Sequence, residues 1–232
     1  MPSYRAVLFD FFGTLTRAVT RGPTHVEIAR MLGCDPGAVV EVLDRSFHAR
    51  ARGRYGSAEQ TLGWIARQAG ASPSAEALAA AAAARVEALR ADTALRPDAV
   101  ATLRGLRRRG LRTAVVSDCT HELPVLLPAL PVAPLLDAQV YSIEVGHCKP
   151  DPAIYLEACA RLGVPPERCL YVGDGGSREL TGAAAVGMTP VRLTAPDLAD
   201  HLVFDPDAEW RGAAVATLSE TVELVDRFPA LV

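Results

Sequence analysis

Arg5-Ala-Val-Leu-Phe-Asp10-Phe-Phe-Gly-Thr-Leu15 is the stretch that decides the fold of this 232-residue chain. Its first half is a short apolar run, typical of a buried strand, and Asp10 follows where that strand ends. Gly13 permits a sharp turn directly after the acid. Because ligands bind at the carboxyl edge of an open parallel sheet, a carboxylate in this place is a candidate for chemistry.

The segment after this strand, residues 16–95, carries only helical patterns. Thr24-x-x-Glu27 and Ser57-x-x-Gln60 have the spacing of capping boxes. Asp35-Pro36 is typical of an N-cap followed by proline at the first helical position. An alanine-rich helix is expected from Ser72-Pro73 towards Arg90. The sequence therefore predicts an all-helical module here.

After Arg96-Pro97 the pattern changes to alternating helices and strands. Strands are expected over 113–117, 138–142, 169–173 and 190–193, and a short further strand precedes a last helix over about 217–228. Strands that alternate with helices at this spacing predict βαβ units and a parallel sheet with helices on both faces. We predict an α/β fold, with a core from residues 1–15 and 96–232 and a helical cap inserted over 16–95.

Composition limits the function classes. The chain is 50% hydrophobic, with a net charge of −3 and a pI near 6.0, which gives no footprint for nucleic acid. No apolar run reaches the roughly 18 residues that a membrane span needs. The five cysteines are scattered, which argues against a disulfide framework or a zinc site. We expect a cytoplasmic protein, monomeric or dimeric, that binds neither nucleic acid nor membrane.

Lys149 is the single lysine among 24 basic residues, and all the others are arginine. An arginine bias this strong indicates that arginine serves wherever any cation suffices. A surviving lysine then indicates a place that needs a compact ammonium group instead of a planar fork.

Four residues fall where the parallel sheet presents its carboxyl ends: Asp10, Ser117, Lys149 and Asp174. Together they match the needs of phosphoryl transfer, with Asp10 as the nucleophile that attacks phosphorus. A hard cation such as Mg²⁺, held by Asp174 and by Glu179 five residues later, would remove the repulsion between carboxylate and phosphate. Lys149 neutralises both groups, and the Ser117 hydroxyl and loop N–H groups bind phosphate oxygens.

These segments resemble the four motifs of the haloacid-dehalogenase-like hydrolase superfamily. Asp10-Phe-Phe-Gly-Thr is similar to the first motif, D-x-D-G-T, Ser117 to the second, Lys149-Pro-Asp-Pro to the third and Val172-Gly-Asp174-x4-Glu179 to the fourth. The resemblance implies a Rossmann-like core with a helical cap after the first strand. It also implies Mg²⁺ held by Asp10, the main-chain carbonyl of Phe12 and Asp174, with Glu179 assisting.

One position departs from the family pattern. The second acid of the first motif, which protonates the leaving alcohol in the family's phosphatases, is Phe12 here. General acid–base help is typically worth about 10²–10⁴ in rate. Three hypotheses stay open: hydrolysis of phosphates with good leaving groups or with an acid from the cap, dehalogenation of 2-haloacids, and binding of a phosphorylated ligand without catalysis. The paired Asp174 and Glu179 favour the first, because the family's dehalogenases work without a metal.

Basic residues gather near the end of the second cap helix and include Arg45, His48, Arg50, Arg52 and Arg54. They form either an electropositive lid over an anionic substrate, with His48 as a substitute proton donor, or a solvated face. Phe47 and Trp64 are expected in the core of the cap. Asp118 either contacts the substrate or caps the next helix. The candidate substrate-binding residues are Gly13, Thr14, Ser117, Asp118, Lys149, His48 and Arg52.

Overall fold

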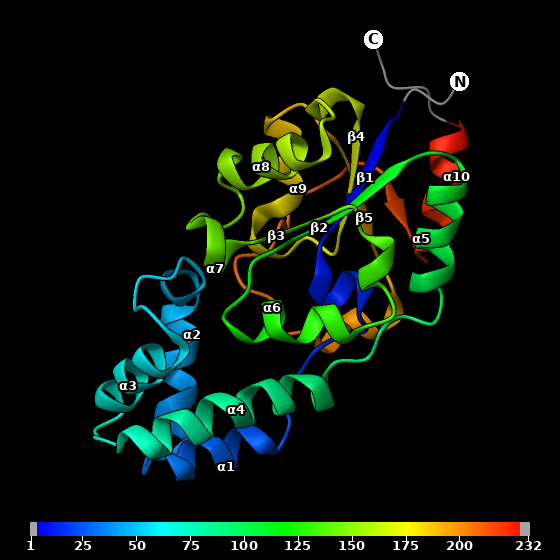
Figure 1. Cartoon of the computed structure of the whole chain (residues 1–232). Helices are drawn as coiled ribbons and strands as arrows, with labels where there is room; N and C mark the ends of the chain where they lie inside the picture. The colour runs from blue at the N-terminus through cyan, green and yellow to red at the C-terminus, as the bar shows by residue number, and fades with distance from the viewer. Residues whose placement is uncertain (1–3, 228–232) are drawn as a thin grey trace.

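The computed structural model describes residues 4–227, and its centre is a six-stranded parallel sheet (Figure 1). The strand order along the sheet is β3-β2-β1-β4-β5-β6, so β1 lies in the middle with β2 and β4 as neighbours. The strands are β1 (Ala6–Phe9), β2 (Arg112–Ser117), β3 (Ala138–Tyr141), β4 (Cys169–Gly173), β5 (Thr189–Leu193) and β6 (Ala214–Val215). This confirms the predicted α/β fold class.

Helices cover both faces of the sheet because successive side chains of a strand point to opposite sides. Ala6 and Leu8 of β1 pack with the helices α8 and α9, whereas Val7 and Phe9 pack with α5 and α10 on the other face (Figure 1). The core helices are α5 (Ala99–Arg108), α6 (Glu122–Leu126), α7 (Ser142–Val145), α8 (Pro152–Leu162), α9 (Glu179–Ala185) and α10 (Ser219–Arg227).

Four helices between β1 and α5 form the cap, and they have an apolar core of their own. They are α1 (Thr24–Met31), α2 (Pro36–Ala51), α3 (Ala58–Gln68) and α4 (Ala75–Asp92). Both connections to the core run side by side: Thr16 and Leu95 form an antiparallel bridge, and Arg17 N donates to Ala94 O at 2.8 Å. We call this pair of connections the stem.

Some of the helix caps and helix ends predicted from the sequence are present in the structure, and others differ. Asp35 accepts from Ala38 N at 2.9 Å, and the capping box of Ser57 and Gln60 is complete. Thr24 does not act as a cap, since α1 already begins there after Pro23. The alanine-rich helix begins at 75, capped by Ser74 instead of Ser72. The last helix is described to residue 227, so the end predicted at 228 lies outside the described residues.

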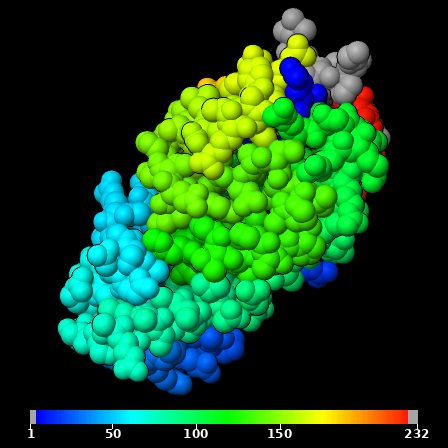
Figure 2. Space-filling model, viewed as in Figure 1, coloured from blue at the N-terminus to red at the C-terminus, as the bar shows by residue number. Residues whose placement is uncertain are grey.

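The cap covers the carboxyl edge of the sheet, and its surface meets the core directly on the face shown in Figure 2. Arg85 of α4 forms an ion pair with Glu122 of α6, so a charged contact bridges cap and core. None of the described helices is long and apolar enough to cross a membrane.

Candidate active site

Asp10 lies at the end of β1, where Asp10 N donates to Val172 O at 2.9 Å and continues the pairing with β4. The chain then turns sharply through Gly13, whose φ of 77° favours glycine. A Cβ atom at Gly13 would lie 2.5 Å from the Nε2 atom of His201, so the absence of a side chain makes room for that ring. The turn leaves the Asp10 carboxylate buried but at the wall of a cavity.

Lys149 joins two of the predicted acids. Its Nζ donates to Asp10 Oδ1 and to Glu179 Oε2, both at 2.6 Å, and the Tyr171 hydroxyl donates to Glu179 Oε2 at 2.8 Å. Burial alone lowers the pKa of Lys149, but the Asp10 and Glu179 carboxylates raise that pKa well above its usual value. The ammonium group is therefore held in its charged form against the candidate nucleophile.

Three carboxylates meet at this point. One oxygen each of Asp10, Asp174 and Glu179 lies within 4.8 Å of the others. Burial raises the pKa of Asp10 to about 7, and burial together with the charges of Glu179 and Asp10 raises the pKa of Asp174 well above its usual range. Lys149 alone does not neutralise two buried acids and the partly buried Asp174, so the donor set fits a hard divalent cation with oxygen ligands.

The loop between Asp174 and Glu179 is strained. Ser177 and Arg178 have positive φ values of 51° and 49°, which non-glycine residues rarely adopt. The backbone of a later segment holds them, since Ser177 N donates to Phe204 O at 2.7 Å and Arg178 N to Asp205 O at 2.9 Å. Strain of this kind is concentrated at functional sites.

Buried polar atoms at the site lack partners among the described residues. They are Thr14 Oγ1, Ser117 Oγ and Asp118 Oδ2. The other oxygen of Asp118 accepts from Lys149 N at 3.0 Å, and burial raises the pKa of Asp118. Asp118 therefore positions the backbone of Lys149, whereas its predicted alternative, capping the next helix, is wrong because α6 begins at Glu122 without a side-chain cap.

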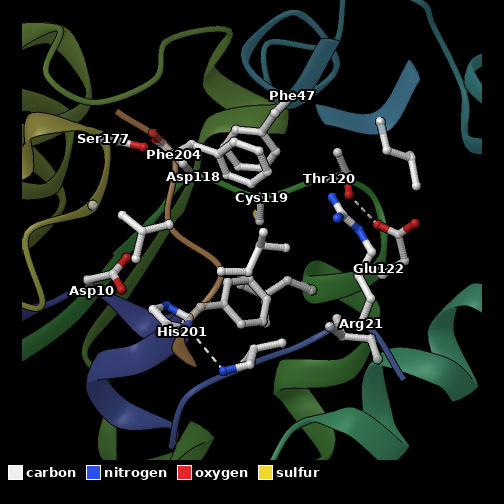
Figure 3. A pocket seen from close by; sticks show the side chains of 18 of the residues that line it. Asp10, Arg21, Phe47, Asp118, Cys119, Thr120, Glu122, Ser177, His201 and Phe204 are labelled. Carbon is white, nitrogen blue, oxygen red and sulfur yellow. Dashed lines mark hydrogen bonds between the residues drawn. The ribbon is translucent and has the colours of Figure 1, made fainter. Parts of the chain in front are cut away.

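A cavity of about 190 Å³ lies between cap and core at this edge (Figure 3). The predicted residues Asp10, Phe12, Asp118, Lys149, Asp174 and Glu179 line it. Gly13, Thr14, Ser117, His48 and Arg52 lie outside the lining set. His48 packs its ring near Phe47 and Phe204, and Arg52 follows the end of α2.

His201 is a site residue that the sequence analysis missed. Its Nδ1 accepts from Val19 N at 2.9 Å, so the proton of the neutral ring is on Nε2, which lies 3.7 Å from Asp174 Oδ2. Burial lowers the pKa of His201. Figure 3 shows this ring beside Asp10. No local pattern marks it, because the contact joins positions 182 residues apart.

An aromatic pair closes the cavity between cap and core. Phe47 of α2 stacks on Phe204 with ring centroids 4.2 Å apart and planes 8° from parallel, as Figure 3 shows. The prediction that Phe47 belongs to the cap core is therefore wrong, because its i+4 spacing does not distinguish packing within the cap from packing against the cavity. Trp64 does pack against the cap core.

Curated relatives include two kinds of hydrolase. A glyceraldehyde 3-phosphate phosphatase of Methanopyrus kandleri is 36% identical over 130 residues, 56% of each chain. An (S)-2-haloacid dehalogenase of a Pseudomonas species is 34% identical over 134 residues, again 56% of each. The chain thus spans about half the length of the curated relatives it matches.

The structural and family comparisons cover more of the chain. A phosphatase structure from Thermococcus onnurineus superimposes with a TM-score of 0.63 at 24% identity, covering 95% of this chain and 97% of that one, which shows the shared fold. The sequence model of the haloacid dehalogenase-like hydrolases matches residues 4–187. This match, together with the sheet order and the site geometry, shows that the chain belongs to the haloacid dehalogenase-like hydrolase family.

Proposed function

We propose that this chain hydrolyses small phosphorylated molecules through a covalent phosphoryl intermediate on Asp10. The observation that carries the proposal is the contact of Lys149 Nζ, 2.6 Å from both Asp10 Oδ1 and Glu179 Oε2, next to a third carboxylate at Asp174. The phosphatase relative supports the same class of substrate.

The proposed reaction has two displacements. An Asp10 oxygen attacks phosphorus and the bond from phosphorus to the leaving oxygen breaks, which leaves an acyl phosphate on Asp10. Water then attacks that phosphorus, and the Asp10 carboxylate is regenerated as inorganic phosphate departs. Lys149 offsets negative charge in both steps, and the unpartnered Ser117 hydroxyl is available as a phosphate donor.

Asp10, Asp174 and the Phe12 carbonyl, with Glu179, would hold Mg²⁺. When bound, the cation supplies positive charge between nucleophile and phosphate. The side chains themselves orient the nucleophile: Lys149 fixes one Asp10 oxygen, and Glu179 is fixed in turn by Tyr171 and by Gly175 N at 2.9 Å.

Phe12 restricts the substrates. It lines the cavity at the position where a phosphatase of this family places its second acid, and it cannot protonate an alcohol. Aryl and acyl phosphates have leaving groups that depart without a proton. We therefore expect aryl and acyl phosphates to be hydrolysed faster than alkyl phosphates.

Hydrolysis of phenyl phosphate with added Mg²⁺ tests the proposal. We expect turnover by the natural chain and none by Asp10→Asn, with Asp200→Asn, an exposed acid outside the cavity, as the matched control. Turnover that survives unchanged in Asp10→Asn would exclude Asp10 as the nucleophile.

Dehalogenation is the second candidate function. A halide leaves without a proton, so this reaction does not need the acid that Phe12 replaces, and a haloacid dehalogenase is among the relatives. In that reaction Asp10 would attack the carbon that bears the halogen and release halide. Chloride release from (S)-2-chloropropionate in EDTA, with no phosphatase activity in Mg²⁺, would replace the first proposal by this one.

A further inference from the structure

Arg50 is a buried cation in the wall of the cavity. It lies in the last turn of α2, is only 5% exposed, and lines the cavity that contains Asp10. Its Nε donates to Ser46 Oγ at 3.0 Å and its Nη2 to Leu43 O at 2.8 Å. These two bonds fix the guanidinium group and use two of its five N–H donors.

No carboxylate of residues 4–227 forms an ion pair with Arg50, although its charged neighbours are paired. Arg85 pairs with Glu122 and Arg21 pairs with Asp44. Burial, reinforced by the positive charges of Arg85 and Arg21, lowers the pKa of Arg50 to about 10, although the carboxylates of Glu122 and Asp44 partly oppose this shift. The guanidinium is therefore charged at neutral pH and buried, and both nearby carboxylates are already paired with other arginines.

An arrangement of this kind is expensive for the folded chain. A buried charge without an ion pair is strongly unfavourable. The position of Arg50 in the last turn of α2 favours a cation only weakly, and its two hydrogen bonds go to neutral groups. Buried charges in proteins are otherwise paired, so the cavity wall is complete only when an anion lies against Arg50.

The cavity has two charged ends and an apolar middle. Figure 3 places Asp10 on one side and Glu122 with Arg21 on the other, and Arg50 belongs to the lining set with its charged neighbours Arg21, Arg85 and Glu122. The lining also contains polar residues such as His25 and Asp92, but much of it is apolar and includes Phe12, Leu43, Phe47, Leu89, Leu123 and Phe204. A molecule that fits has one anionic group at Asp10, an apolar body and a second anion at Arg50.

We propose that Arg50 is a specificity-determining residue that binds a carboxylate at the far end of the substrate. The substrate class is therefore an organic phosphate whose apolar body ends in a carboxylate. The inference rests on the proposed function for the position of the phosphate. The planar guanidinium is held by Ser46 and Leu43 and has three N–H donors left, and a guanidinium is the side-chain group that binds a carboxylate through two parallel hydrogen bonds.

Binding to the Asp10→Asn chain tests the inference without turnover. The probes are phenyl phosphates with a 4-carboxy, 4-carboxymethyl or 4-(2-carboxyethyl) group, each compared with its neutral methyl ester by calorimetry. We expect at least one acid to bind roughly 10- to 100-fold more tightly than its ester. In the double variant with Arg50→Met this preference falls to about one. Arg45→Met, on the exposed face of the same helix, keeps the preference.

The outcomes separate the two proposals. If all three acids bind no more tightly than their esters, or if the preference survives in Arg50→Met, the assignment of Arg50 is overturned even where phenyl phosphate is hydrolysed through Asp10. If hydrolysis is absent but the preference is present and depends on Arg50, the carboxylate site stands and the proposed hydrolysis fails. Arg50→Gln replaces Arg50→Met in the same measurement should the methionine variant not fold.

Discussion

Asp10 combines two properties that oppose each other. The proposed nucleophile must be ionised, yet burial raises the pKa of Asp10 to about 7. Its ionised form is therefore less stable in the fold than in the unfolded chain, where the ordinary pKa is 3.8. The stability that the neutral group gives is complete below pH 3.8 and is lost as the pH rises through about 7. Lys149 reduces this cost without removing it.

We expect Asp10→Asn to stabilise the metal-free chain at high pH. The raised pKa of Asp10 corresponds to roughly 4 kcal/mol at pH 8, at 1.36 kcal/mol per unit, and to less than about 1 kcal/mol at pH 4. Urea unfolding in EDTA at both pH values measures the difference between variant and natural chain. A variant less stable than the natural chain at pH 8 would show that the ion pair with Lys149 outweighs the burial of the carboxylate.

Phe12 gives a second prediction at this scale. Installing an acid with Phe12→Asp restores a proton donor for alcohols, so turnover of alkyl phosphates should rise by about 10²–10⁴. Turnover of phenyl phosphate should change far less, because phenolate leaves without a proton. Parallel kinetics on both esters check this. The same gain on both would mean that the new acid acts on something other than the leaving group.

Single residues differ in how far the sequence predicts them. Asp10, Lys149 and Asp174 could be placed together because each lies in or near a connection at the carboxyl edge of the sheet. His201 and the pairing state of Arg50 could not. The tautomer of His201 is fixed by Val19 N, and whether Arg50 has an ion-pair partner depends on the side chains around it. Both depend on segments that meet only after folding.

At the scale of elements, α4 and α6 hold the cap against the core through Arg85 and Glu122. Burial raises the pKa of Glu122, but the charge of Arg85 prevails and lowers that pKa to about 2. Because the folded pKa is depressed, this pair stabilises the protein above the ordinary value of 4.5 and the stabilisation is lost as the pH falls towards 2.

We expect Glu122→Gln to destabilise the chain by about 3 kcal/mol at pH 7, because it leaves the largely buried side chain of Arg85 without its partner. The difference shrinks as the pH falls from 4.5 towards 2. The control is Glu87→Gln on α4, where an exposed pair with Arg90 is worth less than about 1 kcal/mol. Urea unfolding of both variants measures the contrast, and equal losses would mean that the bridge between cap and core contributes no more than a surface pair.

Elements also show where pattern reasoning stops. The capping boxes and proline positions predict which segments are helices and in what order they follow. Ser72 and Ser74 both precede the same helix, and the pattern does not distinguish them; in the structure Ser74 is the cap. The positive φ values at Ser177 and Arg178 could not be expected from non-glycine residues. The backbone N–H groups of both residues donate to the carbonyl oxygens of Phe204 and Asp205, later in the chain, and these hydrogen bonds hold the conformation.

At the scale of the whole molecule, a cation bound by Asp10, Asp174 and Glu179 should raise the free energy of unfolding. An ion that binds only the folded chain stabilises it by about 2.7 kcal/mol at 100 times its Kd. For a chain of this length that corresponds to roughly 5–10 °C in Tm. We expect this shift with Mg²⁺ and its loss in Asp174→Asn, whereas Asp200→Asn keeps it. An unchanged Tm in the natural chain would contradict a cation site at these acids.

The architecture as a whole was the most predictable part. Alternating apolar strands and helices after residue 96 determine a parallel sheet, since that sequence order buries both faces. How far the cap closes was beyond prediction, because the stacked pair Phe47 and Phe204 joins two separate packing units.

The stem makes the cap a separable insertion. The chain leaves the core before the four cap helices and returns after them through paired connections at Thr16 and Leu95, so the path of the core strands does not depend on the inserted helices. The cap residues that line the cavity, such as Phe47 and Arg50, therefore belong to one continuous stretch of the sequence, whereas Asp10, Lys149 and Asp174 lie outside that stretch.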